Sequence, residues 1–339
     1  MKNPKYFIGL DVHKEHTTHV VKDKRGNILL EGETATLYTE LYPRLKSYLT
    51  KAIIGLEAST SYYTLYQHFL KNGYTIKVAN TVQLRQLIAK NDKLDAQRLS
   101  EMLRLGTFPT SYIPGEDVQH LRSLVQVRHA LMQEQVRCNA RIQAFLDKNG
   151  VVMPPQKAFG KKWTIALIDY LSKTTTCIEL QFEYDHYQFL EKKLQKIEHE
   201  MATYTRTHWK QEYTLLQSIT GIGPVLACYI IAHVHPIERF PSNRKLRRYA
   251  GVIPVFKESA EHKSKGKIPK GTSRKQLRWA LVIAANTAGK TDTPLGRYYR
   301  RKKKQKKLSG IAKIAVASSI VDIIYKVLTT KQPYQPSTS

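Results

Sequence analysis

Cysteine is scarce in this chain of 339 residues. The three cysteines, Cys138, Cys177 and Cys228, lie far apart and form no Cys-x-x-Cys pair. An odd number of widely spaced cysteines excludes a disulfide framework and a thiolate zinc site as the organising feature. We therefore expect a protein of a reducing compartment such as the cytoplasm.

Long apolar runs are also missing. The N-terminus opens with polar residues, and the most apolar stretch near the other end, residues 311–328, is interrupted by Lys313, Asp322 and Lys326. A signal peptide needs a continuous apolar core, and a membrane-spanning helix needs about 20 apolar residues. We expect neither a signal peptide nor a membrane span.

Acidic residues are few compared with basic ones. The chain has 27 Asp and Glu against 55 Lys and Arg, a formal net charge of +28. Residues 241–307 alone hold 21 basic side chains and three acidic ones, with Tyr249, Trp279, Tyr298 and Tyr299 among them. A basic patch that contains aromatic residues is typical of a surface that binds nucleic-acid phosphates.

A glycine turn precedes this basic stretch. The sequence Ile-Thr-Gly-Ile-Gly-Pro at residues 219–224 stands before an apolar helical run and resembles a helix-hairpin-helix element, whose backbone amides hold a DNA phosphate. The turn and the patch together supply the candidate nucleic-acid-binding residues: Gly221, Gly223, Arg247, Arg248, Lys257, Lys263, Lys265, Lys267, Lys270, Arg274, Arg278, Arg300 and Arg301.

Strand and helix patterns alternate in the N-terminal third. Apolar runs at residues 6–12, 52–56 and 74–79 predict strands, and the segments near 37–49 and 92–105 predict helices. This alternation indicates an α/β domain with a mixed sheet over residues 1–112.

The remainder is expected to be helical. Heptad-like spacing over 117–148 and again over 187–204 predicts a coiled-coil or oligomerisation region at 113–210, although a helix hairpin within one chain explains the spacing equally well. A mostly helical C-terminal domain follows at 211–330, and the polar tail 331–339 is expected to be disordered.

Four carboxylates stand out in the predicted α/β domain. Asp11 and Glu57 each end an apolar strand, and Asp92 and Asp95 lie three residues apart, on one face if that segment is helical. Hard oxygen ligands of this kind bind the magnesium ions used in phosphodiester chemistry. Taken singly, Asp92 also suits a helix cap, Asp95 a pair with Arg98, and Asp11 a turn. Taken together they favour a metal site of a ribonuclease-H-like nuclease.

Histidines recur at every third position as His13, His16 and His19. A zinc site is disfavoured, because residues three apart on a strand point to opposite faces.

The acidic motifs, at residues 9–14, 55–59 and 91–96, resemble those of the DEDD insertion-sequence transposases, insertion-sequence family one-ten, which include the Piv-type DNA invertases. The resemblance implies a RuvC-like, ribonuclease-H-type domain in which Asp11, Glu57, Asp92 and Asp95 are catalytic ligands of Mg²⁺.

Residues 247–278 resemble the C-terminal transposase domain of the same family. The resemblance implies a serine nucleophile at Ser259, although Ala260 stands where the family usually has glycine. A serine hydroxyl needs activation, and the hypothesis that follows is a composite site in which the N-terminal metals activate it. From the residues alone a solvated serine in a basic loop is the better explanation, and Ser242, Ser264 and Ser273 are alternatives.

The resemblance therefore implies a transposase that cuts and rejoins DNA in the bacterial cytoplasm, associated with the nucleoid. Its expected partners are double-stranded DNA, at the element ends or junction and at the target, a noncoding bridge RNA, and further copies of the chain in a dimer or tetramer. Two alternatives remain open: a hydrolytic RuvC-like nuclease or junction resolvase without a covalent intermediate, and a non-enzymatic nucleic-acid-binding protein.

Overall fold

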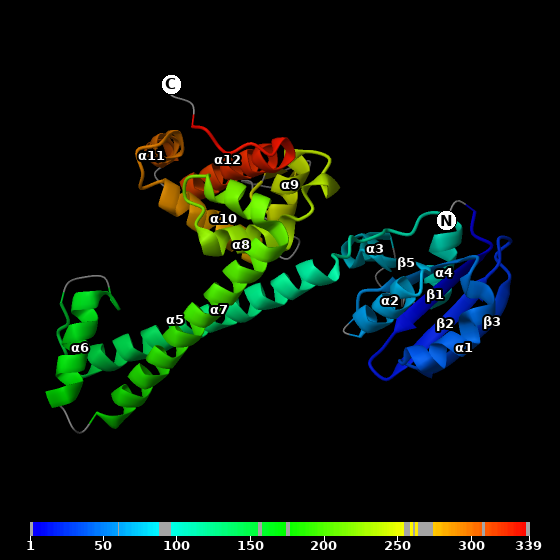
Figure 1. Ribbon diagram of the computed structural model, residues 1–339, viewed down its shortest axis with the longest axis horizontal. Coiled ribbons are helices and arrows are strands. Elements are labelled where there is room, and N and C mark those ends of the chain that lie inside the picture. The colour runs from blue at the N-terminus through cyan, green and yellow to red at the C-terminus, as the bar shows by residue number, and fades with distance from the viewer. Residues whose placement is uncertain are drawn as a thin grey trace. The chain divides into compact units, whose positions relative to one another are not determined.

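The chain forms two compact units that divide between Pro114 and Gly115 (Figure 1). The computed structural model describes residues 3–59, 61–87, 96–154, 158–173, 177–253, 258–259, 262–263, 274–306 and 309–336.

The first unit is built on a five-stranded mixed sheet in the order β3-β2-β1-β4-β5 (Figure 1). β1, β2 and β3 form an antiparallel meander, whereas β1, β4 and β5 run parallel. The mixed sheet predicted from the sequence is thus confirmed. Its elements are β1 (Tyr6–Val12), β2 (His16–Lys22), β3 (Ile28–Ala35), α1 (Tyr38–Leu49), β4 (Ala52–Glu57), α2 (Tyr62–Lys71), β5 (Thr75–Ala79), α3 (Thr81–Leu87) and α4 (Ala96–Arg104).

The two faces of β1 have different roles. Ile8, Leu10 and Val12 are buried in a cluster with apolar residues of α1 and α2. Phe7 lies in a second cluster that includes leucines of α4. Because side chains alternate along a strand, Asp11 shares the face of Phe7, which is the face that α4 covers.

The described residues of the second unit are mostly helical (Figure 1). Its elements are α5 (Glu116–Lys148), α6 (Lys161–Lys173), α7 (Ile178–Gln217), α8 (Pro224–Val234), the 3-10 helix η1 (Ile237–Arg239), α9 (Asn243–Ala250), the two-residue strands β6 (Glu258–Ser259) and β7 (His262–Lys263), α10 (Lys275–Ala288), α11 (Pro294–Lys306) and α12 (Ser309–Thr330).

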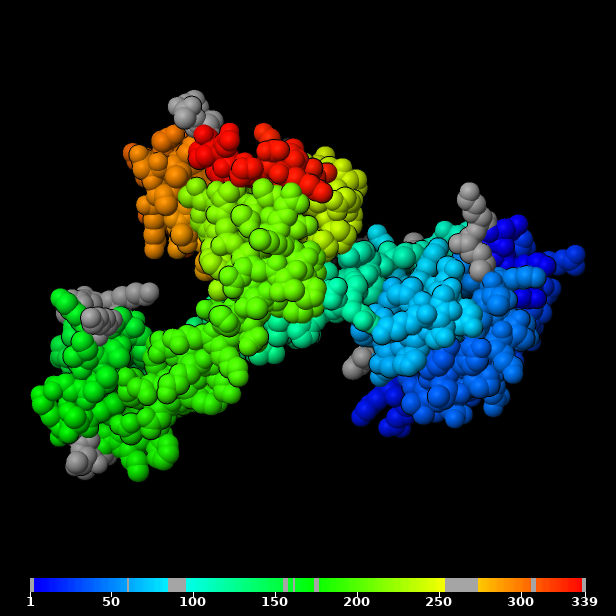
Figure 2. Space-filling model, viewed as in Figure 1, coloured from blue at the N-terminus to red at the C-terminus, as the bar shows by residue number. Residues whose placement is uncertain are grey.

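The long helices α5 and α7 pack against each other as a hairpin within the chain. Figure 2 shows the arm of this hairpin (green) projecting from the helices that follow it. Leu190 and Met201 of the predicted seam are buried within this chain, so the hairpin alternative is the one that the structure has. A helical break at Trp209, with φ −141° and ψ 50°, bends α7 near its end.

The hairpin has two separate cores. Near its tip, Cys138 and Ile142 of α5 pack with Tyr184 of α7 and Trp163 of α6. Near its root, residues of α5 and α7 join one large cluster with α8, α10 and α12. The root therefore belongs to the same packed body as the C-terminal helices, and the structure has two units where three domains were predicted.

The last described residues contact the helical unit through Tyr334. The backbone amide of Tyr334 donates to Ser218 Oγ at 2.8 Å, and its side chain packs on the large helical cluster. Within residues 331–336, the described part of the tail that was predicted to be disordered, Tyr334 thus makes contacts with the helical unit. In the described part of the chain, no helix combines the length and the apolar character needed to cross a membrane.

Candidate active site

Asp11 and Glu57 lie at the carboxyl ends of two neighbouring parallel strands. β1 and β4 are paired in register from Tyr6 with Ala52 to Leu10 with Leu56, and the two acids are the next residue on each strand. Both side chains are half-buried. The central pair of parallel strands therefore places two carboxylates side by side at one edge of the sheet, as ligands for a shared cation require.

Helix α4 begins beside these acids because β1 has a glycine at its contact point. A Cβ atom on Gly9 would lie 2.0 Å from the carbonyl oxygen of Ala96 and 2.7 Å from the amide nitrogen of Ser100. Only the absence of a side chain lets the backbone of α4 approach so closely. The first residue of α4 consequently contacts β1 two residues before Asp11.

Asp92 and Asp95 lie outside the described residues. Asp95 directly precedes Ala96, so the sequence connects it to the helix end that contacts Gly9. Within the described ranges, no group of three or more His, Cys, Asp or Glu side chains is arranged to hold a metal ion. Those ranges contain two of the four predicted ligands, and two neighbouring carboxylates are a donor set that suits a hard divalent cation.

His13 also lies beside the site, although it was not among the predicted metal ligands. Its Nε2 lies 3.1 Å from Oδ2 of Asp11, and its ring stacks on His16 with centroids 4.7 Å apart. His13 and His16 do not point to opposite faces as predicted, because β1 ends at Val12 and a hairpin turn brings both rings together. The signal for this contact was present in the motif, where His13 follows Asp11 by two residues.

Ser259 lies in β6, where it pairs with His262 of β7 in an antiparallel ladder. Its backbone therefore belongs to a short hairpin between α9 and α10. Among the alternatives, Ser242 accepts a hydrogen bond from the amide of Lys245 and caps the N-terminus of α9. That structural role explains Ser242 without catalysis. Ser264 and Ser273 lie outside the described residues.

The predicted nucleic-acid-binding side chains have mixed surroundings. Arg248 is exposed on α9, and Arg300 of α11 forms an ion pair with Asp292 at 2.8 Å. The guanidinium of Arg301 lies 5.3 Å from the ring centre of Tyr298, an arrangement that still leaves its charge available. Arg278 also has interactions within the protein. Lys257, Lys265, Lys267 and Lys270 lie outside the described residues, and Lys263 is described only as a strand residue.

The two glycines of the 219–224 turn differ in their surroundings. Gly221 has a φ of +94°, and a Cβ atom there would lie 2.4 Å from the carbonyl oxygen of Ala284 on α10, so packing alone requires glycine. Gly223 is the exposed N-cap of α8, and Pro224 occupies the first turn. Gly223 is thus the better placed of the two for a phosphate contact.

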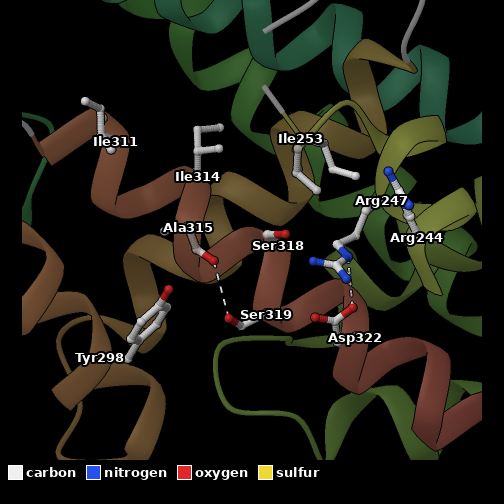
Figure 3. Close-up of a pocket in the computed structure, with 12 residues that line it drawn as sticks. Arg244, Arg247, Ile253, Tyr298, Ile311, Ile314, Ala315, Ser318, Ser319 and Asp322 are labelled. Carbon is white, nitrogen blue, oxygen red and sulfur yellow. Dashed lines mark hydrogen bonds and ion pairs between the residues drawn. The ribbon is translucent and has the colours of Figure 1, made fainter. Parts of the chain in front are cut away.

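A groove of about 840 Å³ lies along α12, next to α9 (Figure 3). Arg244, Arg247 and Asp322 line one part, and Ile311 and Ile314 line another. Arg247 Nε is 3.1 Å from Oδ1 of Asp322. Part of the charge of Arg247 therefore holds α9 against α12.

A mixed sheet with acids at the ends of its central parallel strands, followed by a largely helical unit rich in basic residues, is the arrangement expected of a DEDD transposase. Two family models match the chain: "Transposase", of the DEDD type of the IS110 group, over residues 8–150, and "Transposase IS116/IS110/IS902 family" over residues 213–300. Together they span more than half of the sequence. The chain belongs to the IS110 family of DEDD transposases.

The individual relatives have low sequence identity to this chain, but the matches cover most of both sequences. The chain is 24% identical over 260 residues to "Transposase for insertion sequence element IS1328" of Yersinia enterocolitica, a match covering 73% of each chain. It is 25% identical to "Putative transposase y4qE" of Sinorhizobium fredii, covering 83% of this chain and 71% of the relative. It is 22% identical to "Transposase for insertion sequence element IS1111A" of Coxiella burnetii, covering 97% of this chain and 91% of the relative.

Proposed function

We propose that this protein moves an insertion sequence by cutting and rejoining DNA, with Asp11, Glu57, Asp92 and Asp95 as ligands of Mg²⁺ and Ser259 as the nucleophile. The observation that carries the proposal is the contact between Gly9 and the start of α4. It brings the residue after Asp95 to the strand that bears Asp11, beside the strand that bears Glu57.

The side chains at this edge of the sheet would hold and orient the metal ions. Asp11 and Glu57 present their carboxylates from a rigid sheet, and His13 fixes Oδ2 of Asp11 through the 3.1 Å contact. Ligands held by such neighbours keep their geometry when a cation binds. When bound, magnesium ions would activate the attacking oxygen and stabilise the charge on the leaving oxygen.

Ser259 supplies the step that distinguishes a recombinase from a nuclease. Its Oγ forms a bond to phosphorus, the phosphodiester bond to the leaving strand breaks, and the serine proton leaves with that strand or passes to water. The resulting phosphoserine keeps the energy of the broken bond, so a strand hydroxyl can later displace the serine and restore the phosphodiester.

The partners in this proposal are double-stranded DNA at the element ends and target, and a bridge RNA that guides their pairing. The basic residues of 241–307 suit both, because phosphate recognition by charge is common to DNA and RNA. A dimer or tetramer would hold two duplexes. Since Leu190 and Met201 are buried within the chain, such an assembly would use other faces of the hairpin.

Covalent trapping tests the mechanism. The full-length protein is incubated with Mg²⁺, bridge RNA and labelled DNA of the element junction, then denatured and resolved by electrophoresis. We expect a protein–DNA adduct that is absent in Ser259→Ala and in Asp11→Asn but present in Ser242→Ala. Full strand cleavage by Ser259→Ala would establish hydrolytic nuclease chemistry instead. DNA binding with no cleavage under any of these conditions would leave a non-enzymatic binding protein.

A further inference from the structure

One face of helix α12 forms the floor of the groove of about 840 Å³ (Figure 3). Its residues Ile311, Ile314, Ser318 and Asp322 all line the groove, and they follow one another at intervals of three or four positions, which places them along one side of the helix. The floor therefore changes from apolar to polar along the helix. A cavity of this size, apolar with a few polar groups, is typical of a site that binds an organic ligand.

The polar part of the groove contains a charge pair. Nε of Arg247 lies 3.1 Å from Oδ1 of Asp322, and Nδ2 of Asn243 donates to the same oxygen at 2.8 Å. The arginine and the carboxylate offset each other, so this pair gives the floor no excess charge to attract a phosphate. Asp322 and the hydroxyl of Ser318 are nevertheless suited to the edge of a nucleic-acid base, because carboxylates accept hydrogen bonds from base amino groups and serine hydroxyls bond to donors or acceptors.

Exposed positive charge flanks this floor. Figure 3 shows Tyr298 of α11 on one side of the groove and Arg244 of α9, an exposed residue, on the other. The guanidinium of Arg301 and Nζ of Lys302 lie 5.3 Å and 5.6 Å from the centre of the Tyr298 ring. Helix α11 has several more basic residues and no acidic one in its sequence. A strand that crosses the groove would therefore meet cations on both sides of an apolar floor.

This distribution of apolar, polar and charged groups matches the parts of one nucleotide. A base has two apolar faces and a hydrogen-bonding edge, and it is joined to phosphates on either side. In a duplex the faces are stacked on neighbouring bases and the edge is paired, so a base can enter the groove only from an unpaired position. Nucleic-acid-binding proteins hold such bases on apolar and aromatic side chains while basic side chains contact the backbone.

We propose that the groove along α12 binds the base of one unpaired nucleotide, from a bulge, a loop or a single-stranded end of the nucleic acid on which the protein acts. The base packs on Ile311 and Ile314, and its edge bonds to Ser318 and Asp322. The phosphate next to it lies near Arg244. The inference deepens the proposed function by naming the part of the nucleic acid that this surface takes, and it rests on that function for its biological role.

Fluorescence anisotropy with two matched probes tests this site. The full-length protein is titrated against fluorescein-labelled DNA duplexes that carry, at one bulged position, either an adenine or an abasic site. The buffer contains no divalent cation, which the proposed cleavage requires. Both probes have the same phosphates, so a difference in affinity comes from the base. We expect the adenine probe to bind about tenfold more tightly, in the range that the stacking of one base contributes. RNA duplexes of the same sequence form a second arm.

Two isoleucines of similar exposure provide the variant and its matched control. Ile311 lines the groove and is 47% exposed, whereas Ile283 of α10 does not line it and is 38% exposed. Ile311→Gln should reduce the preference for the adenine probe to about twofold or less, because it removes an apolar contact of the base. Ile283→Gln should keep the preference. Arg244→Gln should weaken the binding of both probes by the same factor, because it removes a charge near the phosphate.

Equal affinity of the wild-type protein for the adenine and abasic probes, in both DNA and RNA, would overturn the proposal. So would a preference that Ile311→Gln keeps, or one that Ile283→Gln loses to the same extent, since the base would then not be bound in the groove. A preference in only one of the two arms would assign the base to DNA or to RNA. All three substituted residues are exposed, so the variants are expected to fold, and circular dichroism checks this. Because binding is measured without cleavage, failure of covalent trapping at Ser259 would leave this result intact.

Discussion

Replacing Gly9 by alanine tests how the candidate active site is assembled. The new Cβ would lie 2.0 Å from the carbonyl oxygen of Ala96, whereas ordinary van der Waals contacts of a Cβ atom lie at 3.4–4 Å. The start of α4 would therefore have to move by about 1.4 Å to reach ordinary contact, and the obstacle is backbone, which cannot rotate away as a side chain can. Overpacking of this size costs about 1–3 kcal/mol of unfolding free energy.

The expected effect on activity is larger than the effect on stability. Metal–ligand distances tolerate about 0.2 Å, and a displacement of about 1 Å at a reacting centre costs on the order of 100-fold in rate. We expect Gly9→Ala to fold, as judged by urea unfolding, and to lose about 100-fold in Mg²⁺-dependent cleavage of junction DNA.

Gly32→Ala is the matched control for this experiment. It lies on β3 of the same sheet, where a new Cβ would meet only the ring of His19 at 3.3 Å. We expect nearly full activity from this variant. Wild-type cleavage rates in a folded Gly9→Ala protein would refute the reasoning, because the approach of α4 to β1 would then have no part in placing the acids.

Other predictions concern single contacts. His13→Ala should raise the Mg²⁺ concentration for half-maximal cleavage by about tenfold, because His13 orients Asp11. His16→Ala should change this concentration little. Equal values for the two variants would exclude a positioning role for His13. Hydrogen bonds from Arg104 and Lys22 lower the pKa of Glu101 to about 2, so this carboxylate stabilises the fold above about pH 5 and its contribution is lost as the pH falls toward 2. Since about a third of Glu101 is exposed, the loss should be about 1 kcal/mol, and it should be absent from the pH dependence of urea unfolding in Glu101→Gln. Leu190→Ala should lower the free energy of unfolding by about 2–4 kcal/mol without changing the molar mass measured by sedimentation. Phe182→Ser, at a side chain 69% exposed, should lower that mass if copies associate through the outer face of the hairpin. A change of mass with Leu190→Ala would contradict the packing of the hairpin within the chain.

Local sequence patterns predicted the strands that carry the acids. The runs that became β1 and β4 are apolar because the central strands of this sheet are largely buried, and Asp11 and Glu57 interrupt that pattern at its end. The position of both acids at strand ends followed from the pattern alone. Their side-by-side placement required the parallel pairing of β1 with β4, which no local pattern specifies.

Contacts between distant segments were beyond prediction from the sequence. The heptad spacing of α5 and α7 gave their buried faces but not the partner, since the same spacing suits a neighbour in the chain or in another copy. The approach of α4 to Gly9 depends on the absence of a Cβ atom, and a single glycine produces no periodic pattern in the sequence. Tyr249 contacts Arg239 and Arg274, which lie in separate segments whose positions in space are set by the core.

The two separate cores of the α5–α7 hairpin make the arm between them a spacer of adjustable length. An α-helix rises 1.5 Å per residue and a heptad restores the same face, so deleting seven residues from each helix between the cores would shorten the arm by about 10 Å while keeping its seam in phase. The reach of the tip relative to the root can thus change through matched insertions or deletions, without redesign of either end.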